Sequence, residues 1–202
     1  MTSITHRPYM QVRIEIAKKI SIKYKHELSN KDLESFASIL ERKELPKGEL
    51  FLNDSQISKY IQYVDKGLVR QFYYKNGRDV TEHFTCENNV AVCIESFFRQ
   101  EPTRLLIEAL EPTILYCIPY NKIEVLAVRE PEIGILYRRF LEATLILSQQ
   151  KADSWRFESV RERYERFIKE YPQAAKRAPI AHIASYLLMT PESLSRVRSG
   201  QW

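Results

Sequence analysis

Residues 179–198 read PIAHIASYLLMTPESLSRVR, and this stretch decides the fold of the last part of the chain. Pro179 can open one short helix, and Thr190 with Pro191 then opens a second, because threonine caps a helix and proline suits its first position. So short a turn makes the two helices cross steeply, and the small side chain of Ala184 lets their backbones approach. The pattern predicts a helix-turn-helix whose second helix is in the recognition position.

The outer face of that second helix carries side chains that suit DNA. We expect contacts with DNA from Thr190, Glu192, Ser193, Ser195, Arg196 and Arg198. Arg196 can pair with guanine or a phosphate, Glu192 can accept a hydrogen bond from cytosine, and the serines can donate to phosphates or base edges. We expect Lys176 and Arg177, just before this segment, to add charge near phosphates. The alternative is an ordinary solvated terminal helix.

The charge of the chain is uneven. Its 31 basic and 26 acidic residues give a net charge of +5, and residues 156–202 alone carry +4 of it. A local basic excess suits a nucleic acid or another anionic partner, although a solvated helix surface would also explain it.

Composition excludes several classes of protein. The 202 residues are 44% hydrophobic and 28% charged, as in an ordinary folded domain. No apolar run approaches the ~18 residues of a membrane span, and charged residues interrupt residues 1–20, so we expect no membrane contact and no signal peptide. Cys86, Cys93 and Cys117 are odd in number and widely spaced, which favours the reducing cytoplasm over a disulfide framework.

Residues 48–118 alternate between short β-like runs and turn residues. The predicted strands are 49–52, 60–64, 68–74, 80–85, 90–94, 105–110 and 114–118. Asn76-Gly77 predicts a two-residue type I′ hairpin, because both residues tolerate a positive φ. The spacing predicts a small antiparallel barrel, roll or sandwich. Two helices are expected before it, around residues 10–20 and from Ser29 to a stop at Pro46.

A long helix is predicted from Pro131 to about residue 157, roughly 40 Å at 1.5 Å per residue. Its apolar residues follow a spacing of three and four that is typical of a coiled coil: Ile133, Leu136, Phe140, Ala143 and Leu147. We expect this seam to pack against a second copy, and the alternative is that it packs only on the β domain. Ser159 and Glu162 form a capping-box pattern, so a new helix and a domain boundary are expected there.

Three stretches together resemble the cyclic-AMP receptor protein/Fnr superfamily of bacterial transcription regulators, in its short Bacteroidetes-type branch. They are residues 183–198 (IASYLLMTPESLSRVR), residues 102–103 with 107–111, and residues 45–51 (LPKGELF). The resemblance covers residues 29–202 and implies an α+β protein. Residues 1–130 would hold N-terminal helices and a cyclic-nucleotide-binding-like β-roll (a double-stranded β-helix or jelly roll), 131–158 a dimerisation helix, and 159–202 a helix-turn-helix domain. It also implies a cytoplasmic homodimer on an inverted-repeat operator that recruits or blocks RNA polymerase.

The same resemblance points to an effector pocket in the roll. It would be lined by Glu95, Ser96, Thr103, Arg104, Thr144, Ser148 and Gln149. The family holds a cyclic nucleotide with a Gly-Glu pair and an Arg-Ser pair. Here Ile94 precedes Glu95, and Thr103-Arg104 lies where Arg-Ser would be. We therefore expect a degenerate pocket that binds cyclic AMP weakly or not at all. No cofactor is assigned with certainty, and a cyclic nucleotide is left open.

The DNA-binding part departs from the family in further ways. The sequence between Pro172 and Pro179 leaves no room for a β-hairpin wing, so an almost wholly helical unit is expected. Leu188 stands where these motifs usually place glycine, and a left-handed backbone there would cost on the order of 1–2 kcal/mol. The recognition helix is short, and we expect its last turn to be missing or provided by packing of Trp202.

Two other classes of function remain as alternatives. One is a module that senses a cyclic nucleotide or small ligand and whose last helices mediate protein interaction. The other is a cupin-like metalloenzyme, which is disfavoured because Glu82 and His83 are adjacent and so face opposite sides of a strand. His83 has no spaced partner for a metal, and no catalytic motif occurs, so we predict neither a metal site nor an enzyme.

Overall fold

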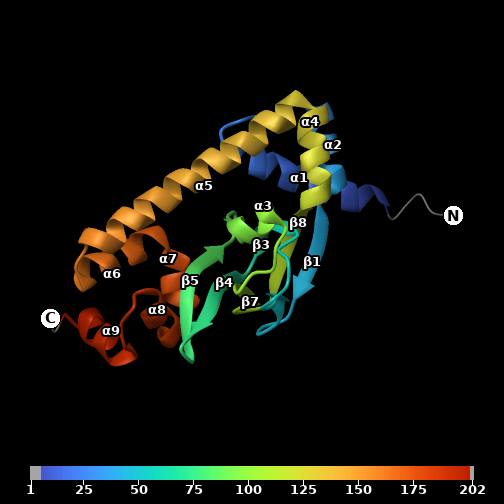
Figure 1. Ribbon diagram of the computed structural model, residues 1–202. Helices are drawn as coiled ribbons and strands as arrows, with labels where there is room; N and C mark the ends of the chain where they lie inside the picture. Colours follow the sequence, from blue (N-terminus) through green and yellow to red (C-terminus); the bar gives the residue numbers. More distant parts are fainter. Residues whose placement is uncertain (1–5, 201–202) are drawn as a thin grey trace.

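The computed structural model describes residues 6–200, with the two ends of this range far apart (Figure 1). Its helices are α1 (His6–Lys23), α2 (Asn30–Ile39), α3 (Ile94–Arg99), α4 (Tyr120–Arg129), α5 (Pro131–Phe157), α6 (Val160–Glu170), α7 (Pro172–Arg177), α8 (Ile180–Tyr186) and α9 (Pro191–Arg198). Within this range, none of the helices combines the length and the apolar character needed to cross a bilayer.

The predicted β-roll is confirmed as two packed antiparallel sheets. The strands are β1 (Glu41–Leu45), β2 (Leu50–Leu52), β3 (Tyr60–Lys66), β4 (Leu68–Lys75), β5 (Arg78–Cys86), β6 (Val90–Ala91), β7 (Leu106–Ala109) and β8 (Thr113–Pro119). One sheet has the order β1-β8-β3-β6 and the other β2-β7-β4-β5. Asn76 and Gly77 have φ values of 52° and 74° and join β4 to β5, as the sequence predicts for a type I′ hairpin.

Two local predictions are wrong. The helix that begins after Ser29 ends at Ile39, well before Pro46, and residues 41–45 form β1 instead, paired with β8. This charged segment is compatible with a helix, but pairing with the edge of β8 satisfies its backbone hydrogen bonds in the sheet. The expected strand over 90–94 is short, because Ile94 begins helix α3.

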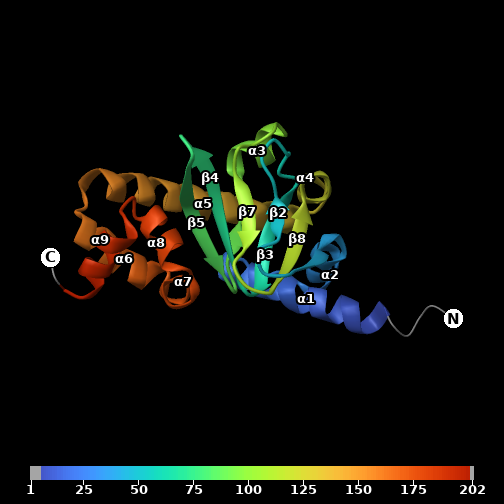
Figure 2. The same ribbon diagram turned by 90° about the horizontal axis from the view of Figure 1, so that it is seen from below.

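Helix α5 runs from α4 at one end of the molecule to the C-terminal helices at the other (Figures 1 and 2). In its first half Ile133, Leu136 and Phe140 are buried against α1, α2 and the β3–β8 sheet. The ring of Phe140 meets that of Tyr24 edge-on, with centroids 5.4 Å apart. The prediction that these three residues contact a second copy is therefore wrong, because they already belong to the core of their own chain.

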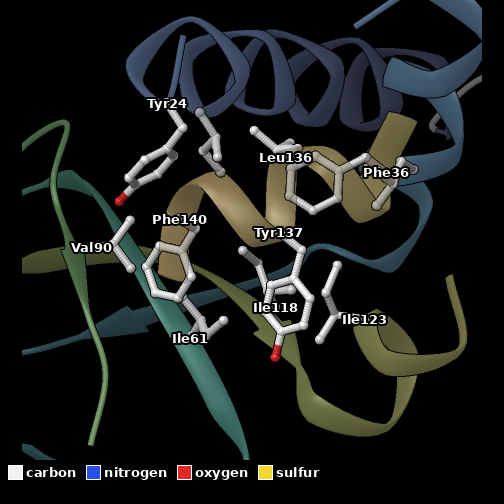
Figure 3. Close-up of a pocket in the computed structure, with 11 residues that line it drawn as sticks. Tyr24, Phe36, Ile61, Val90, Ile118, Ile123, Leu136, Tyr137 and Phe140 are labelled. Carbon is white, nitrogen blue, oxygen red and sulfur yellow. The ribbon is translucent and has the colours of Figure 1, made fainter. Parts of the chain in front are cut away.

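This core contains a small apolar cavity of about 20 Å³ among the side chains that join α1, α2 and α5 to the sheet (Figure 3). It has room for about one water molecule and almost no polar lining to hold one. The cavity is therefore a packing feature, not a ligand site.

The C-terminal helices dock on the outer strand of the second sheet, mainly α8 on β5 (Figure 2). Aromatic rings make this contact: Phe84 of β5 lies 5.9 Å from Phe167 and 5.8 Å from Tyr186, between ring centroids. Ser159 and Glu162 form the predicted capping box at the start of α6. Residues 160–200 contain helices and turns without a strand, so the expected absence of a wing holds for this described part.

Candidate nucleic-acid interface

The turn of the helix-turn-helix is a Schellman motif. The N–H of Met189 donates to the carbonyl oxygen of Ala184 at 3.0 Å, and the N–H of Leu188 donates to that of Ser185 at 3.1 Å. Leu188 has a φ of 53°, so it adopts the left-handed conformation that usually selects glycine. Its side chain is 64% exposed and the chain tolerates the backbone strain here.

Helix α9 begins as the sequence predicts. Oγ1 of Thr190 accepts a hydrogen bond from the N–H of Ser193 at 3.2 Å, and Pro191 is the first helical residue. Glu192 lies in the first turn, where its pKa is lowered by a hydrogen bond from its own backbone N–H and by the hydroxyl of Thr190. Glu192 is therefore an acceptor at neutral pH.

The inner face of α9 packs on α8 and leaves the outer face to solvent. Leu194 and Val197 are buried, and Ala184 is buried where the two helices meet. Among the predicted DNA-contacting residues of α9, the exposed ones are Glu192, Ser195, Arg196 and Arg198, while Ser193 is partly buried. Neither arginine forms an ion pair with any residue that the structure describes. The outer face therefore offers two exposed cations that no described residue holds in an ion pair, although Arg196 acts on the carboxylate of Glu192 through its charge.

Helix α8 is fixed to β5 by polar contacts as well as by the rings. Oγ of Ser185 accepts from the N–H of Thr81 at 2.9 Å and donates to the carbonyl oxygen of Asp79 at 2.8 Å. The guanidinium of Arg70 is buried between Asp79 and Glu108, and its Nη1 lies 2.8 Å from Nδ1 of His182. Burial first, and then the charge of Arg70, lower the pKa of His182, so the imidazole is a neutral acceptor in this contact.

The two cations expected before the motif lie in different environments. Lys176 is exposed, as a phosphate contact would need. Arg177 instead bridges Glu87 and Glu111, each at 2.7 Å. Its hydrogen bond to Glu87 is the main cause that lowers the pKa of that carboxyl to about 2. Two carboxylates already hold the guanidinium of Arg177, and its contact with a phosphate stays a prediction.

The roll residues predicted to bind an effector do not converge. Glu95 is exposed and 3.5 Å from Arg99, and Oγ of Ser96 is occupied by the N–H of Ser58 and the carbonyl of Glu101. Oγ1 of Thr103 accepts from the N–H of Leu105. The guanidinium carbon of Arg104 lies 4.3 Å from the centroid of the Tyr73 ring. The predicted pocket is therefore not assembled by these side chains.

The effector residues predicted on α5 lie elsewhere. Thr144 and Ser148 line a wide groove between α5, β5 and the C-terminal helices, while Gln149 is exposed outside it. Two residues of this groove that the sequence reasoning did not assign are His83 and Lys151. Lys151 continues the inner face of α5 four residues after Leu147, and this spacing is the signal that could have placed it.

The described residues show no group of three or more His, Cys, Asp or Glu that could hold a metal. Cys86, Cys93 and Cys117 are buried and free, and burial raises their pKa values. They behave as small apolar packing residues.

Two packed antiparallel sheets, a long connecting helix and a terminal helix-turn-helix make up the described architecture. No protein-family model matches the sequence, and no curated protein matches it. Solved structures do match its fold.

These structures are Crp/Fnr-type regulators. FixK2 from Bradyrhizobium japonicum is 19% identical over 80% of this chain and 84% of its own, with a TM-score of 0.66. The c-di-GMP-responsive global regulator CLP of Xanthomonas campestris is 15% identical over 85% and 91%, with a TM-score of 0.65. A protein described as a Crp/Fnr-family transcriptional regulator, from Eubacterium rectale, is 17% identical over 86% and 84%, with a TM-score of 0.64. The chain has the fold of these regulators.

Proposed function

We propose that this protein is a DNA-binding transcription regulator of the Crp/Fnr type, and not an enzyme. The observation that carries the proposal is the outer face of α9, where Arg196 and Arg198 stand exposed without an ion-pair partner in the described chain. A recognition helix needs such a face, because bidentate guanidinium contacts read guanine in the major groove. The fold shared with Crp/Fnr regulators supports the same conclusion.

We further propose a homodimer built on the second half of α5. There the apolar residues Leu145 and Ala152, both exposed, lie seven residues apart, and the side chain of Leu145 is 63% exposed. A seam of this spacing is buried when it meets its copy. Two recognition helices related by the dimer axis would enter successive major grooves about one turn, or ~34 Å, apart, and so read an inverted repeat.

The remaining parts of the proposal follow from this role. The operator and RNA polymerase are the expected partners, in the cytoplasm, where buried free thiols such as Cys93 are stable. The nucleotide cassette is proposed to be degenerate, because Glu95 and Arg104 are engaged by Arg99 and Tyr73.

Selection from a pool of random DNA duplexes with the purified full chain tests the function. We expect enrichment of an inverted repeat whose half-sites lie about ten base pairs apart. The double variant R196A/R198A should enrich nothing, whereas Arg99→Ala, which removes an exposed cation on α3, should enrich the same repeat. A pool without enrichment would overturn the proposal and favour the alternative of an interaction module.

A further inference from the structure

We propose that His182 is a positioning residue for DNA binding: its neutral imidazole keeps the helix-turn-helix docked on the roll, and acid releases the motif by protonating it. The inference rests on the proposed function, because it concerns how the recognition helix is presented to DNA. One contact carries it, in which Nδ1 of His182 lies 2.8 Å from Nη1 of Arg70. His182 belongs to α8 and Arg70 to β4, so the contact joins the motif to the roll.

The chemistry of this contact requires a neutral histidine. An arginine guanidinium keeps its charge in proteins and can only donate hydrogen bonds. The side chain of Arg70 is 5% exposed, so water cannot replace its partners freely. Nδ1 of His182 must therefore accept, and the ring proton is on Nε2. A proton on Nδ1 would set one donor against another at 2.8 Å and one positive charge beside another.

Charged groups face the imidazole from three strands of the described chain: Arg70 of β4, Asp79 of β5 and Glu108 of β7. The two carboxylates favour a protonated ring, but Arg70 already binds them, Asp79 at 2.8 Å and Glu108 at 2.7 Å. Burial and then the charge of Arg70 outweigh them and lower the pKa of His182 below its usual value of about 6.5. Protonation therefore disfavours the docked state.

The position of α8 determines that of the recognition helix. Next to His182, Oγ of Ser185 accepts from the N–H of Thr81 at 2.9 Å, so this N–H of β5 is satisfied by the motif and not by another strand (Figure 2). Leu194 of α9 lies in the same buried cluster as Ala184 of α8. Contacts that hold α8 on β5 therefore hold α9 as well.

The docked arrangement is the one that favours DNA. It leaves Arg196 and Arg198 of α9 exposed. Two recognition helices must also match major grooves about ~34 Å apart, and a motif that is already oriented pays less ordering entropy on binding. Because the pKa of His182 is lowered by docking, the stabilisation of the docked state is complete above about pH 6.5 and declines as the pH falls below it.

The first experiment needs no DNA. Hydrogen exchange of the Thr81 amide is measured by NMR in the unaltered full chain and in His182→Asn, at about pH 7.5 and about pH 5.5. Oδ1 of asparagine takes the place of Nδ1 and accepts without titrating. Because the sequence around Thr81 is the same in both proteins, the ratio of the two rates reports the release of α8. One proton with an ordinary pKa of about 6.5 predicts that this ratio rises about three- to tenfold in acid.

The amide of Leu115, in the inner strand β8, is the internal control and should keep a constant ratio. A Thr81 ratio that does not change with pH overturns the proposal. An equal rise at Leu115 would mean that acid unfolds the whole chain, and this also overturns it. Both results are independent of whether the protein binds DNA.

The second experiment measures affinity for the selected operator at the same two pH values and constant ionic strength. On acidification the unaltered chain should lose at least about threefold more affinity than His182→Asn. His26→Gln is the control, because His26 contacts Glu132 at the start of α5, away from the motif, and this variant should keep the full acid loss.

The outcomes separate this inference from the proposed function. If the unaltered chain and His182→Asn bind the operator but lose affinity equally in acid, the positioning role is wrong and the proposed function stands. A gain of affinity in acid that His182→Asn lacks would show that docking inhibits DNA binding, and it too overturns the inference. If no operator is bound at either pH, the proposed function fails, and the positioning role in DNA binding fails with it.

Discussion

Nη2 of Arg177 lies 2.7 Å from Oε2 of Glu87, and this ion pair ties the segment before the helix-turn-helix to the end of β5. Nη1 of the same arginine reaches Glu111 at 2.7 Å, in the turn that joins β7 to β8. Together with the hydrogen bonds between Ser185 and β5, these contacts hold the helix-turn-helix against the roll. The position of the motif therefore depends on carboxylates of the roll, which gives the two parts a direct physical connection.

The first prediction concerns pH. The pKa of Glu87 is lowered to about 2 in the folded chain, below its unfolded value of about 4.3. The stabilisation from this pair is therefore complete above about pH 4.5 and is lost as the pH falls toward 2. In Glu87→Gln we expect the free energy of unfolding to be lower at pH 6 and to depend less on pH between 4.5 and 2. Chemical unfolding at a series of pH values measures this.

Glu34→Gln is the control, because Glu34 is an exposed carboxyl of α2 in a region remote from Arg177. It should leave the pH profile unchanged. A Glu87→Gln profile parallel to that of the unaltered chain would contradict the assignment.

The second prediction concerns the turn. In Leu188→Gly the left-handed strain of about 1–2 kcal/mol is removed, and the extra entropy of glycine in the unfolded chain offsets part of it. We expect the free energy of unfolding to rise by about 0.5–1 kcal/mol. Leu188→Val should lower it, because a β-branched residue tolerates a positive φ least. Thermal unfolding of both variants measures these changes in stability. A loss of stability in Leu188→Gly would contradict the prediction and would mean that contacts of the leucine side chain stabilise the fold.

The third prediction compares two residues of the apolar row that the sequence identifies on α5, Phe140 and Leu147. Phe140→Ala removes a buried ring that packs on Tyr24, so it should lower the free energy of unfolding by about 3–5 kcal/mol. Leu147 is 65% exposed, and Leu147→Ala should cost less than about 1 kcal/mol. Similar losses in the two variants would show that Leu147 is buried in solution.

Much of this architecture could be predicted from the sequence, because short-range signals specify particular turns and the starts of helices. Asn76-Gly77 specifies its hairpin by φ alone, and Thr190-Pro191 specifies the start of α9 by capping. The seam on α5 was misassigned because spacing identifies an apolar face but not its partner, which here is the chain's own α1 and α2.

The site residues show the same limit. The environments of Arg177 and Lys151 depend on contacts across more than sixty positions of sequence, with Glu87, Glu111 and Glu82. No pattern within one segment reports such contacts. The outer face of α9 was predictable because a helix's own period fixes which residues face away from its packed side.

The fourth prediction concerns assembly. Leu145→Glu places a charge on the proposed dimer seam and should yield a monomer at micromolar concentration by light scattering, because a buried carboxylate is costly. Val128→Glu is the control, since Val128 is an exposed apolar residue of α4, outside the seam. If the unaltered protein is a monomer, or if the Leu145→Glu variant remains a dimer, the proposed dimer interface is wrong.

The most direct test of the central claim is the affinity of Arg196→Ala for the selected operator and for operators with single base changes. If Arg196 reads guanine, the variant should lose about 1–3 kcal/mol of discrimination at one position of each half-site. Lys176→Ala should weaken binding to all sequences alike and lower the salt slope by about one. An Arg196→Ala protein with the affinity and base preference of the unaltered chain would contradict the account, even if it bound DNA through another face.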